Sequence, residues 1–347
     1  MKITSPPERI PDVGELGAVH LIGAGGRGMS GIARILSLRG VPVTGSDAKE
    51  SAAVTALAAL GITCHVGHDA ANIGDADTVV ISSAIPEANP ELVEARRRGL
   101  RVLPLTVALV ALMRGYRGVA VAGTHGKTTT TSMLTVALQH CGLDPSFAVG
   151  GNLVSSGANA HHGTGDVFVA ETDESDGSFV VFEPDVAVVT NIDYDHVDQW
   201  DDQESYVASF DAFAERVVGG GTLVVCQDDE RAAALGRRRA AAGVRVRRYG
   251  EHPDSDVRIA SVVTRGLTTR LHVVVNGRRL PEIRLGVPGH HNALNAVAAL
   301  TAGLELGVAE REISEGLETF RGTLRRFELK GEAAGVRVFD DFAHHPT

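Results

Sequence analysis

One pattern recurs along this chain and constrains its fold more than any other feature. A short run of β-branched residues is followed by a glycine-rich turn and then by a stretch rich in alanine and leucine. This alternation predicts parallel strands covered by helices, the architecture of an α/β protein. The predicted strands are 18–22, 78–82, 118–122, 166–170, 185–189 and 222–226, and helices are predicted after the glycine turns near 28 and 126 and over 291–306.

Residues 251–287 follow a different pattern. The segment SVVTRGLTTRLHVVVNGRRL alternates as antiparallel strands do and contains the turn pair Asn276-Gly277. We therefore predict a small antiparallel β insertion, joined at Asn276-Gly277, before the helix over 291–306. The 347 residues are enough for two or three domains, and a boundary is predicted near 105–117, around LMRGYRG.

Composition excludes several classes of protein. The formal charge of -10 argues against nucleic acid as the main partner, because that partner selects a basic surface. Cys64, Cys141 and Cys226 lie far apart, which indicates neither a disulfide framework nor a zinc site and fits a reducing compartment. The N-terminus has no apolar run behind a basic start, and no membrane-length apolar segment follows, so we expect a cytoplasmic protein with no membrane partner. The oligomeric state stays open.

The first glycine-rich loop lies in IGAGGRGMSGIA, residues 22–33. Read as Gly23-x-Gly25-x-x-Gly28, it matches the dinucleotide-binding fingerprint, and Asp47 ends the next strand at about the distance expected of a ribose-binding acid. A helix N-terminus favours any diphosphate, so this pattern does not name the nucleotide. A glycine turn without a ligand and an NAD-linked oxidoreductase are the alternatives.

The second loop, GTHGKT over residues 123–128, is more specific. It lies between the strand GVAVA and a predicted helix over 129–140, so backbone amides can cradle the β and γ phosphates of a nucleotide while a threonine hydroxyl reaches Mg²⁺. Val121 stands where the standard P-loop has its first glycine, so this is a shorter variant.

Lys127 carries the charge of that loop, and it is the sole lysine between positions 50 and 329. A compact ammonium can follow a phosphate during transfer more readily than a rigid guanidinium can. Because an unneutralised Lys127 beside amide donors is unfavourable, we predict a bound anion here. The alternative is a purely structural turn.

Acids and a histidine follow the next two predicted strands. Strand 166–170 runs into ETDESD, residues 171–176, whose carboxylates repel one another, so Glu171 at the strand end is predicted to hold Mg²⁺. Strand 185–189 leads to His196, for which we predict a metal or phosphate role, because the carboxyl ends of parallel strands share one crevice. A solvated acidic loop and a structural histidine are the alternatives.

Three further residues are weaker candidates. Asn292 and Asn295 lie three residues apart at the start of a predicted helix, and their amides can pair with the edge of a purine. Arg326, in the pair Arg325-Arg326, can reach a γ-phosphate. Helix capping by the asparagines and a surface position for the arginines are the ordinary alternatives.

Taken together, these segments resemble the Mur ligases, and within them the branch that adds alanine. The resemblance is carried, in the family's order and over nearly the whole chain, by GAGGRGMSGIA, VVISSAIPEANPE, GTHGKTTTTSM, DESDGSF, TNIDYDHVD, PGHHNALNA, RRFE and DDFAHHPT. It implies a Rossmann-like parallel-sheet domain over 1–115 that binds a UDP sugar and a P-loop α/β domain over 116–322 that binds ATP. It also implies the start of a C-terminal ligase domain over 323–347.

The activity implied by the resemblance is ATP-dependent ligation of L-alanine to the carboxylate of UDP-N-acetylmuramic acid through an acyl phosphate, in peptidoglycan precursor synthesis. The implied UDP-sugar contacts are Gly25, Gly26, Gly28, Asp47, Ser82 and Ser83. The implied ATP contacts are Gly123, Thr124, His125, Gly126, Lys127, Thr128, Thr129, Asn292, Asn295, Arg326 and Asp341. Two Mg²⁺ ions are implied, one on Glu171 with Thr128 or Thr129 and one on His196, and the implied catalytic residues are Lys127, Glu171, His196 and Arg326.

The chain departs from the family pattern in places. Thr172 stands where alanine is usual, and Phe342 where tyrosine is usual. The chain stops at DDFAHHPT, a motif that opens a third domain in the family, so we expect a truncated chain that binds substrates but ligates poorly. The alternatives at this point are a murein tripeptide ligase of cell-wall recycling, an NAD-linked oxidoreductase and a non-catalytic nucleotide-binding module.

Overall fold

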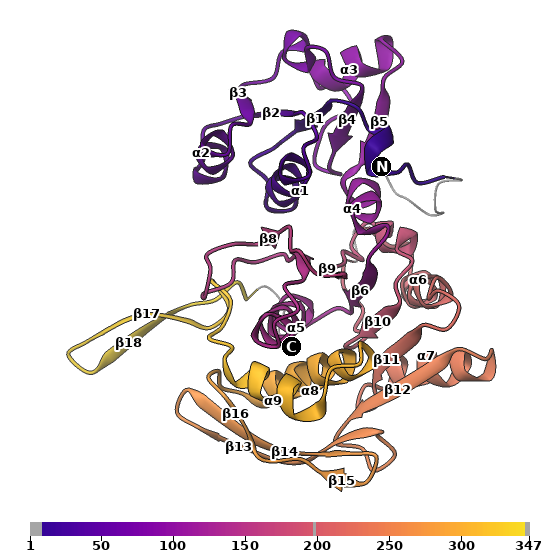
Figure 1. Cartoon of the computed structure of the whole chain (residues 1–347), viewed down its shortest axis with the longest axis vertical. Helices are drawn as coiled ribbons and strands as arrows, with labels where there is room; N and C mark the ends of the chain where they lie inside the picture. The colour runs from indigo at the N-terminus through magenta and orange to yellow at the C-terminus, as the bar shows by residue number, and fades with distance from the viewer. Residues whose placement is uncertain (1–8, 197–198, 344–347) are drawn as a thin grey trace.

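The computed structural model of the chain describes residues 9–196 and 199–343 (Figure 1). Residues 197–198 of the motif TNIDYDHVD and residues 344–347 of DDFAHHPT lie outside the described residues. The structure is of the α/β class, as the strand, turn and helix pattern predicted, and it contains two large sheets. In the described part of the chain, no helix is long and apolar enough to cross a membrane.

The first sheet has five strands in the order β3-β2-β1-β4-β5, all paired in parallel. Its strands are β1 (Val19–Ile22), β2 (Val43–Asp47), β3 (Thr63–Val66), β4 (Thr78–Ile81) and β5 (Arg101–Pro104). The connecting helices are α1 (Arg27–Leu38), α2 (Ala52–Ala59) and α3 (Pro90–Arg97), with 3-10 turns η1 (Val13–Glu15) and η2 (Ala70–Ile73). All four residues of β1 and of β4 are buried, as expected of strands covered on both faces.

The second sheet has eleven strands and is mixed. Its strands are β6 (Arg117–Ala122), β7 (Ser146–Ala148), β8 (Ala160–His161), β9 (Val167–Glu171), β10 (Val186–Val189), β11 (Thr222–Cys226), β12 (Arg245–Gly250), β13 (Val257–Arg265), β14 (Thr268–Val275), β15 (Arg278–Arg279) and β16 (Ile283–Leu285). Strand β6 lies between β9 and β10 and pairs with both in parallel. The loops that follow these three strands therefore leave the sheet at the same edge.

The antiparallel insertion extends this second sheet. Strands β13 and β14 pair antiparallel, and Asn276-Gly277 joins β14 to β15, with φ of 49° and 83° at the two turn residues. The longest hairpin of the insertion, however, turns at Gly266, where φ is 59°, and not at Asn276-Gly277. Strand β13 also pairs in parallel with β12, so the insertion continues the main sheet.

The helices of this second half are α5 (Lys127–His140), α6 (Gln203–Glu215), α7 (Glu230–Ala241), α8 (His290–Glu305) and α9 (Glu310–Glu318), with the 3-10 turn η3 (Ser178–Val181). Helix α5 packs against both α8 and α9, and the three lie together in Figure 1. This packing brings the start of α8 close to the loop before α5. Strands β17 (Glu328–Ala333) and β18 (Val336–Asp340) form a separate hairpin that extends away from the body of the molecule (Figure 1).

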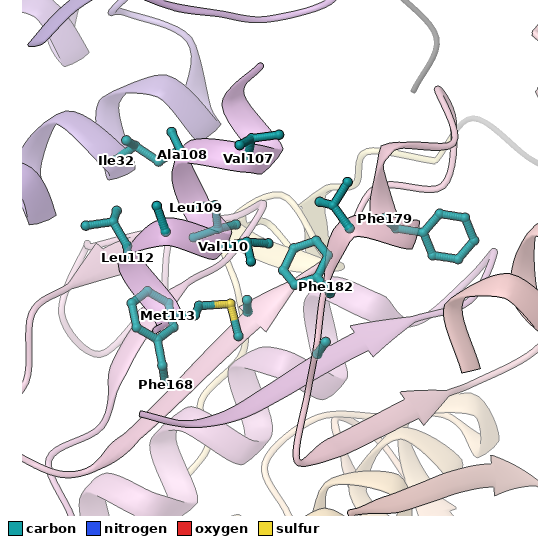
Figure 2. Packing of buried hydrophobic residues seen from close by; sticks show 14 of the residues in the cluster. Ile32, Val107, Ala108, Leu109, Val110, Leu112, Met113, Phe168, Phe179 and Phe182 are labelled. Atoms are coloured by element: carbon teal, nitrogen blue, oxygen red, sulfur yellow. The ribbon is translucent and has the colours of Figure 1, made fainter. Parts of the chain in front are cut away.

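Helix α4 (Leu105–Met113) lies between the two sheets, and its residues from Thr106 to Met113 are all buried. Figure 2 shows its side chains between Ile32 of α1 and Phe168 and Phe182 of the second half. One hydrophobic cluster therefore runs from the first sheet through α4 into the second. The domain limits 1–115, 116–322 and 323–347 stay predictions.

Candidate active site

The site is built at the shared edge of β9, β6 and β10. Strand β6 is followed by the loop 123–126 and by α5, which starts at Lys127, two residues before the predicted start of that helix. Gly126 precedes the helix with φ of 84°, a conformation that suits glycine. Glu171 ends β9, and the loop after β10 carries His196.

The ammonium of Lys127 is fully hydrogen-bonded in this structure. Its Nζ donates to the carbonyl oxygens of Gly123 (2.6 Å) and Thr124 (3.1 Å) and to Oε1 of Glu174 (2.8 Å). The premise that Lys127 is unneutralised without a bound anion is therefore wrong, because the buried Glu174 supplies a negative charge. The bound anion itself stays a prediction. The sequence pattern missed this residue among the four acids of ETDESD.

Glu171 contacts the start of α5 directly. Its Oε1 accepts a hydrogen bond from the Thr128 hydroxyl at 2.7 Å, and its Oε2 accepts one from the Gly150 amide at 2.5 Å. Loss of hydration raises the pKa of Glu171, although these hydrogen bonds and the charges of Lys127 and Arg326 act in the opposite direction.

His196 has φ of 55°, which is uncommon for a residue other than glycine. Its Nε2 lies 3.7 Å from Oε1 of Glu174 and 3.8 Å from Oδ2 of Asp195. Hydrogen bonding to the Glu174 carboxylate is the main cause that raises the pKa of His196, and the charges of Asp195 and Asp173 add to it.

These residues line a cavity of about 350 Å³, which we call the β6 pocket. Its lining comes from six separated parts of the chain: Thr124, His125, Gly126, Lys127, Thr128, Thr129, Glu171, Asp195, His196, Val287, His291, Asn292, Asn295, Phe320, Gly322, Thr323, Arg326, Phe327, Asp341, Phe342 and Ala343. Every predicted ATP contact is in this set except Gly123, whose carbonyl instead holds Lys127.

The two asparagines do not cap α8, because its N-cap is Gly289 and no side chain caps it. The Asn292 amide donates to the carbonyl of Pro288 at 2.7 Å, and the Thr130 hydroxyl of α5 donates to Asn295 Oδ1 at 3.3 Å. Both side chains are therefore anchored to their surroundings while they line the pocket.

Arg326 enters the pocket from the segment before β17. The flanking residues Arg325 and Phe327 have φ of 62° and 50°, so the backbone is in the left-handed region on both sides of it. Its Nη2 lies 3.5 Å from the Thr128 hydroxyl. Strained backbone of this kind often accompanies functional positions.

A second cavity of about 510 Å³, the α1 pocket, lies against the first helix. Its lining residues are Gly25, Arg27, Ser30, Arg34, Ala52, Ala53, Ala56, Leu57, Gly151, Asn152, Gly157, Asn159, Leu324, Arg325, Glu328, Lys330 and Asp340. Four of these are basic: Arg27, Arg34, Arg325 and Lys330.

Of the six predicted UDP-sugar contacts, only Gly25 lines the α1 pocket. The Asp47 carboxylate accepts the Gly25 amide at 2.9 Å and so holds the glycine loop in place. Ser82 and Ser83 follow β4, and with Gly26 and Gly28 they are outside the lining of either described pocket.

Phe342, which the sequence marked only as a departure from the family pattern, lies where the two pockets meet. The guanidinium groups of Arg27, Arg325 and Arg326 lie 5.1, 4.8 and 5.6 Å from the centre of its ring. The first two arginines line the α1 pocket and the third lines the β6 pocket. No local signal could have identified this junction, because Arg27 and Phe342 lie 315 positions apart in the chain.

Tyr206 of α6 was also missed by sequence reasoning. Its buried hydroxyl lies 2.8 Å from that of Thr124, which in turn donates to the carbonyl of Asp193 at 2.8 Å. Burial raises the pKa of Tyr206, so the phenol stays protonated. The hydroxyl pair ties the loop after β6 to helix α6, and the hydrogen bond from Thr124 to Asp193 ties the same loop to the one after β10.

The residues around Glu171 suit a magnesium ion in type, because carboxylate and hydroxyl oxygens are ligands that Mg²⁺ accepts. Burial raises the pKa of Glu171, and the hydrogen bonds of Thr128 and Gly150 act against this effect. Within residues 9–196 and 199–343, however, no three histidine, cysteine or acidic side chains gather as a metal site. An ion held here would take most of its ligands from hydroxyls, water or a bound phosphate.

The family model of the Mur ligase middle domain matches residues 121–303, and the model of the Mur ligase family catalytic domain matches residues 18–117. The chain belongs to the Mur ligase family. Because the matching family and the similar proteins are ligases, the alternative of an NAD-linked oxidoreductase is wrong.

The similar proteins include UDP-N-acetylmuramate–L-alanine ligases. The one from Mycobacterium sp. (strain JLS) is 54% identical, over 99% of this chain and 72% of its own length. The one from Saccharopolyspora erythraea is 57% identical, over 95% of this chain and 68% of its own length.

Two solved structures share the fold. A UDP-N-acetylmuramate-alanine ligase from Thermotoga maritima matches with a TM-score of 0.83 and 32% identity, over 95% of this chain and 75% of its own. A murein peptide ligase from Psychrobacter arcticus matches with a TM-score of 0.81 and 27% identity, over 95% of this chain and 74% of its own.

Proposed function

We propose that this Mur ligase uses ATP to couple L-alanine to the carboxylate of UDP-N-acetylmuramic acid, with ATP in the β6 pocket and the UDP sugar in the α1 pocket. The observation that carries the proposal is the convergence of Lys127, Glu171 and His196 from three adjacent strand ends onto one cavity. L-alanine is proposed as the amino acid because the alanine ligases are 54% and 57% identical to this chain, whereas the murein peptide ligase is 27% identical.

The proposed chemistry needs no side-chain nucleophile. An oxygen of the sugar carboxylate attacks the γ-phosphorus of ATP and ADP leaves, which forms an acyl phosphate. The amine of alanine then attacks the acyl carbon, and the tetrahedral intermediate loses a proton and expels inorganic phosphate. The protein contributes by positioning the reactants and neutralising charge.

Each part of the site has a place in this scheme. Lys127 and Arg326 would neutralise the phosphate oxygens, and Asn292 and Asn295 would contact the adenine. Glu171 and the threonine hydroxyls would hold Mg²⁺, which when bound screens the charge of the phosphates. A second ion near His196 is a further part of the proposal.

The arrangement of the two pockets supports a transfer between them. The basic residues Arg27, Arg34 and Arg325 suit a diphosphate in the α1 pocket. Arg325 and Arg326 are neighbours in sequence but line different pockets, and both pack on Phe342. A carboxylate held near this ring would lie close to both sites.

The test measures phosphate release with ATP, UDP-N-acetylmuramic acid and a panel of amino acids, with the mycobacterial relative as a positive control. Binding of UDP-N-acetylmuramic acid and of ATP to this chain is measured in parallel by calorimetry. We expect binding of both substrates and phosphate release that requires both UDP-N-acetylmuramic acid and L-alanine. The rate should lie well below that of the mycobacterial relative, because we propose that this chain binds its substrates but ligates poorly.

Two results would count against the proposal. Release that requires L-alanyl-γ-D-glutamyl-meso-diaminopimelate and not L-alanine would favour a murein tripeptide ligase. Absence of binding of either nucleotide would remove the ligase proposal for this chain. The variant Lys127→Met should lose ATP binding, while its matched control Lys49→Met, at an exposed lysine, should not.

A further inference from the structure

Glu174 is the most completely buried acid near the β6 pocket. Its side chain is 1% exposed, and its Oε1 accepts the Lys127 ammonium at 2.8 Å. The same oxygen lies 3.7 Å from Nε2 of His196. Its second oxygen, Oε2, is buried and has no hydrogen-bond partner within the described part of the chain. A buried charge with one oxygen unpaired is costly, so this arrangement calls for an explanation.

The donors of Lys127 indicate what Glu174 does. An ammonium has three N–H groups, and here they point to the carbonyls of Gly123 and Thr124 and to Glu174. The two carbonyls belong to the loop that carries Lys127, so they keep the side chain at the wall of the pocket. The third N–H is the one that can be exchanged for a ligand.

Glu174 lies behind this wall. Lys127 and His196 line the β6 pocket, whereas Glu174 is absent from its lining. A phosphate would therefore approach the ammonium from the pocket while the carboxylate holds it from the protein side. The two anions compete for one N–H and also repel each other across the ammonium.

We propose that Glu174 is an internal competitor for phosphate: it takes the third N–H of Lys127 in the empty site, keeps the ammonium in place, and gives up that hydrogen bond when a nucleotide polyphosphate enters. This inference rests on the proposed function only in that a polyphosphate occupies the β6 pocket. His196 is near enough to Oε1 to remain a partner of the carboxylate after the exchange. Glu174 acts through Lys127, so it is a positioning residue and one that limits nucleotide affinity.

The first test compares the affinity for Mg²⁺ and AMP-PNP, a non-hydrolysable ATP analogue, in the wild type and in Glu174→Gln. Removing the competing charge should tighten binding about tenfold. The matched control is Asp173→Asn, which removes one charge from an exposed position in the same loop and should change the affinity less than about twofold. Equal affinities in Glu174→Gln and Asp173→Asn would overturn the inference. Weaker binding by Glu174→Gln would also overturn it, because the carboxylate would then assist the ligand or its cation.

The second test observes Lys127 itself and does not depend on the variant folding. The chain has only four lysines, Lys2, Lys49, Lys127 and Lys330, so selective ¹⁵N labelling of lysine gives an ammonium spectrum that can be assigned, with Lys127→Arg identifying the signal. Inorganic tripolyphosphate added to the wild type should shift the Lys127 signal and leave those of Lys2 and Lys49 in place. Lys330 is not a control, because it lines the α1 pocket. An unchanged Lys127 signal at saturating tripolyphosphate would overturn the exchange.

Glu174→Gln also has a spectroscopic readout that simple destabilisation would not produce. In the empty variant, the Lys127 signal alone should broaden through faster exchange with water, while the thermal midpoint reports overall stability separately. Failure of the wild type to bind AMP-PNP or tripolyphosphate would reject the proposed function. Normal binding by the wild type with no tightening in Glu174→Gln would reject this inference alone.

Discussion

Two glutamates of this chain, Glu91 and Glu174, have buried carboxylates and are stabilised in different ways. Glu174 pairs with the ammonium of Lys127, whereas Glu91 accepts hydrogen bonds from Ser46 (2.5 Å) and Asn72 (2.6 Å) and lies 3.6 Å from Nε2 of His20. Burial alone would raise the pKa of Glu91, but these contacts outweigh it and lower the pKa to about 2. The charge of Glu91 is thus part of the stability of the first sheet.

Glu91 should make the stability of the protein depend on acidity. Its folded pKa, about 2, lies below the ordinary value of 4.5, so its contribution is complete above pH 4.5 and is lost as the pH falls towards 2. The full contribution is roughly 3 kcal/mol. Urea unfolding of Glu91→Gln should show a lower free energy of unfolding at pH 7 and a flatter dependence between pH 4.5 and 2.

The control for this prediction is Glu87→Gln, since the Glu87 side chain is 70% exposed and pairs with Arg96 at the surface. We expect it to follow the wild type at every pH. If Glu91→Gln also follows the wild type across the acidic range, the contacts around Glu91 do not lower its pKa in solution.

At the scale of elements, the junction of β6 and α5 determines the geometry of the pocket. Gly126 satisfies two constraints there. Its φ of 84° is one that side chains rarely adopt, and a Cβ at this position would lie 2.4 Å from Oδ1 of Asn295 in α8. The Asn295 side chain of α8 therefore packs closely on the backbone of the loop, and this contact brings the candidate adenine-binding amides next to the candidate phosphate-binding amides.

The substitution Gly126→Ala should reveal that contact. The positive φ costs about 1 kcal/mol, and the overlap with Asn295 adds about 1–3 kcal/mol. Gly40→Ala is the matched control, because φ is 76° and no atom lies within 4 Å of the added Cβ. Urea unfolding should show a larger loss for Gly126→Ala, accompanied by weaker binding of AMP-PNP. Equal losses in the two variants would mean that the approach to Asn295 is not tight.

For the whole molecule, the question is whether the two sheets form independent units. Helix α4 is LTVALVALM, apolar on all sides, which is typical of a helix enclosed by other elements. Its side chains pack with α1 on one side and with Phe168 and Phe182 on the other (Figure 2). The two pockets are therefore related by a packed core and by the Phe342 junction.

Shortening a buried side chain of α4 should lower the stability of both halves together. Leu112 is fully buried, so Leu112→Ala should lower the free energy of unfolding by about 2–5 kcal/mol. A single unfolding transition, seen alike by circular dichroism and by the fluorescence of Trp200, should shift as a whole. Leu38→Ala, at a leucine that is 52% exposed, should have little effect. Two separated transitions in Leu112→Ala would show that the halves are independent.

Much of the fold could be predicted from the sequence because its signals are local. The strand before each glycine turn, the helix after it and the antiparallel pattern of 251–287 depend on residues close in the chain. The predicted ATP contacts were gathered into one pocket for a related reason, since the order of parallel strands brings their carboxyl ends together. Ser82, Ser83 and Asp47 do not line the α1 pocket, because a fingerprint loop identifies a segment but not the walls of a pocket, and their contact with a UDP sugar stays a prediction.

The sequence by itself determined the α/β class, the loop that carries Lys127 and the acids that follow β9, because these follow from local composition and spacing. Only the tertiary structure decided that Glu174, of the four acids in ETDESD, reaches Lys127, that Gly126 contacts Asn295, and that Phe342 joins three arginines between the pockets. These contacts join residues that are 16 to 315 positions apart in the chain. Their distances depend on how the elements pack, and no local pattern encodes that packing.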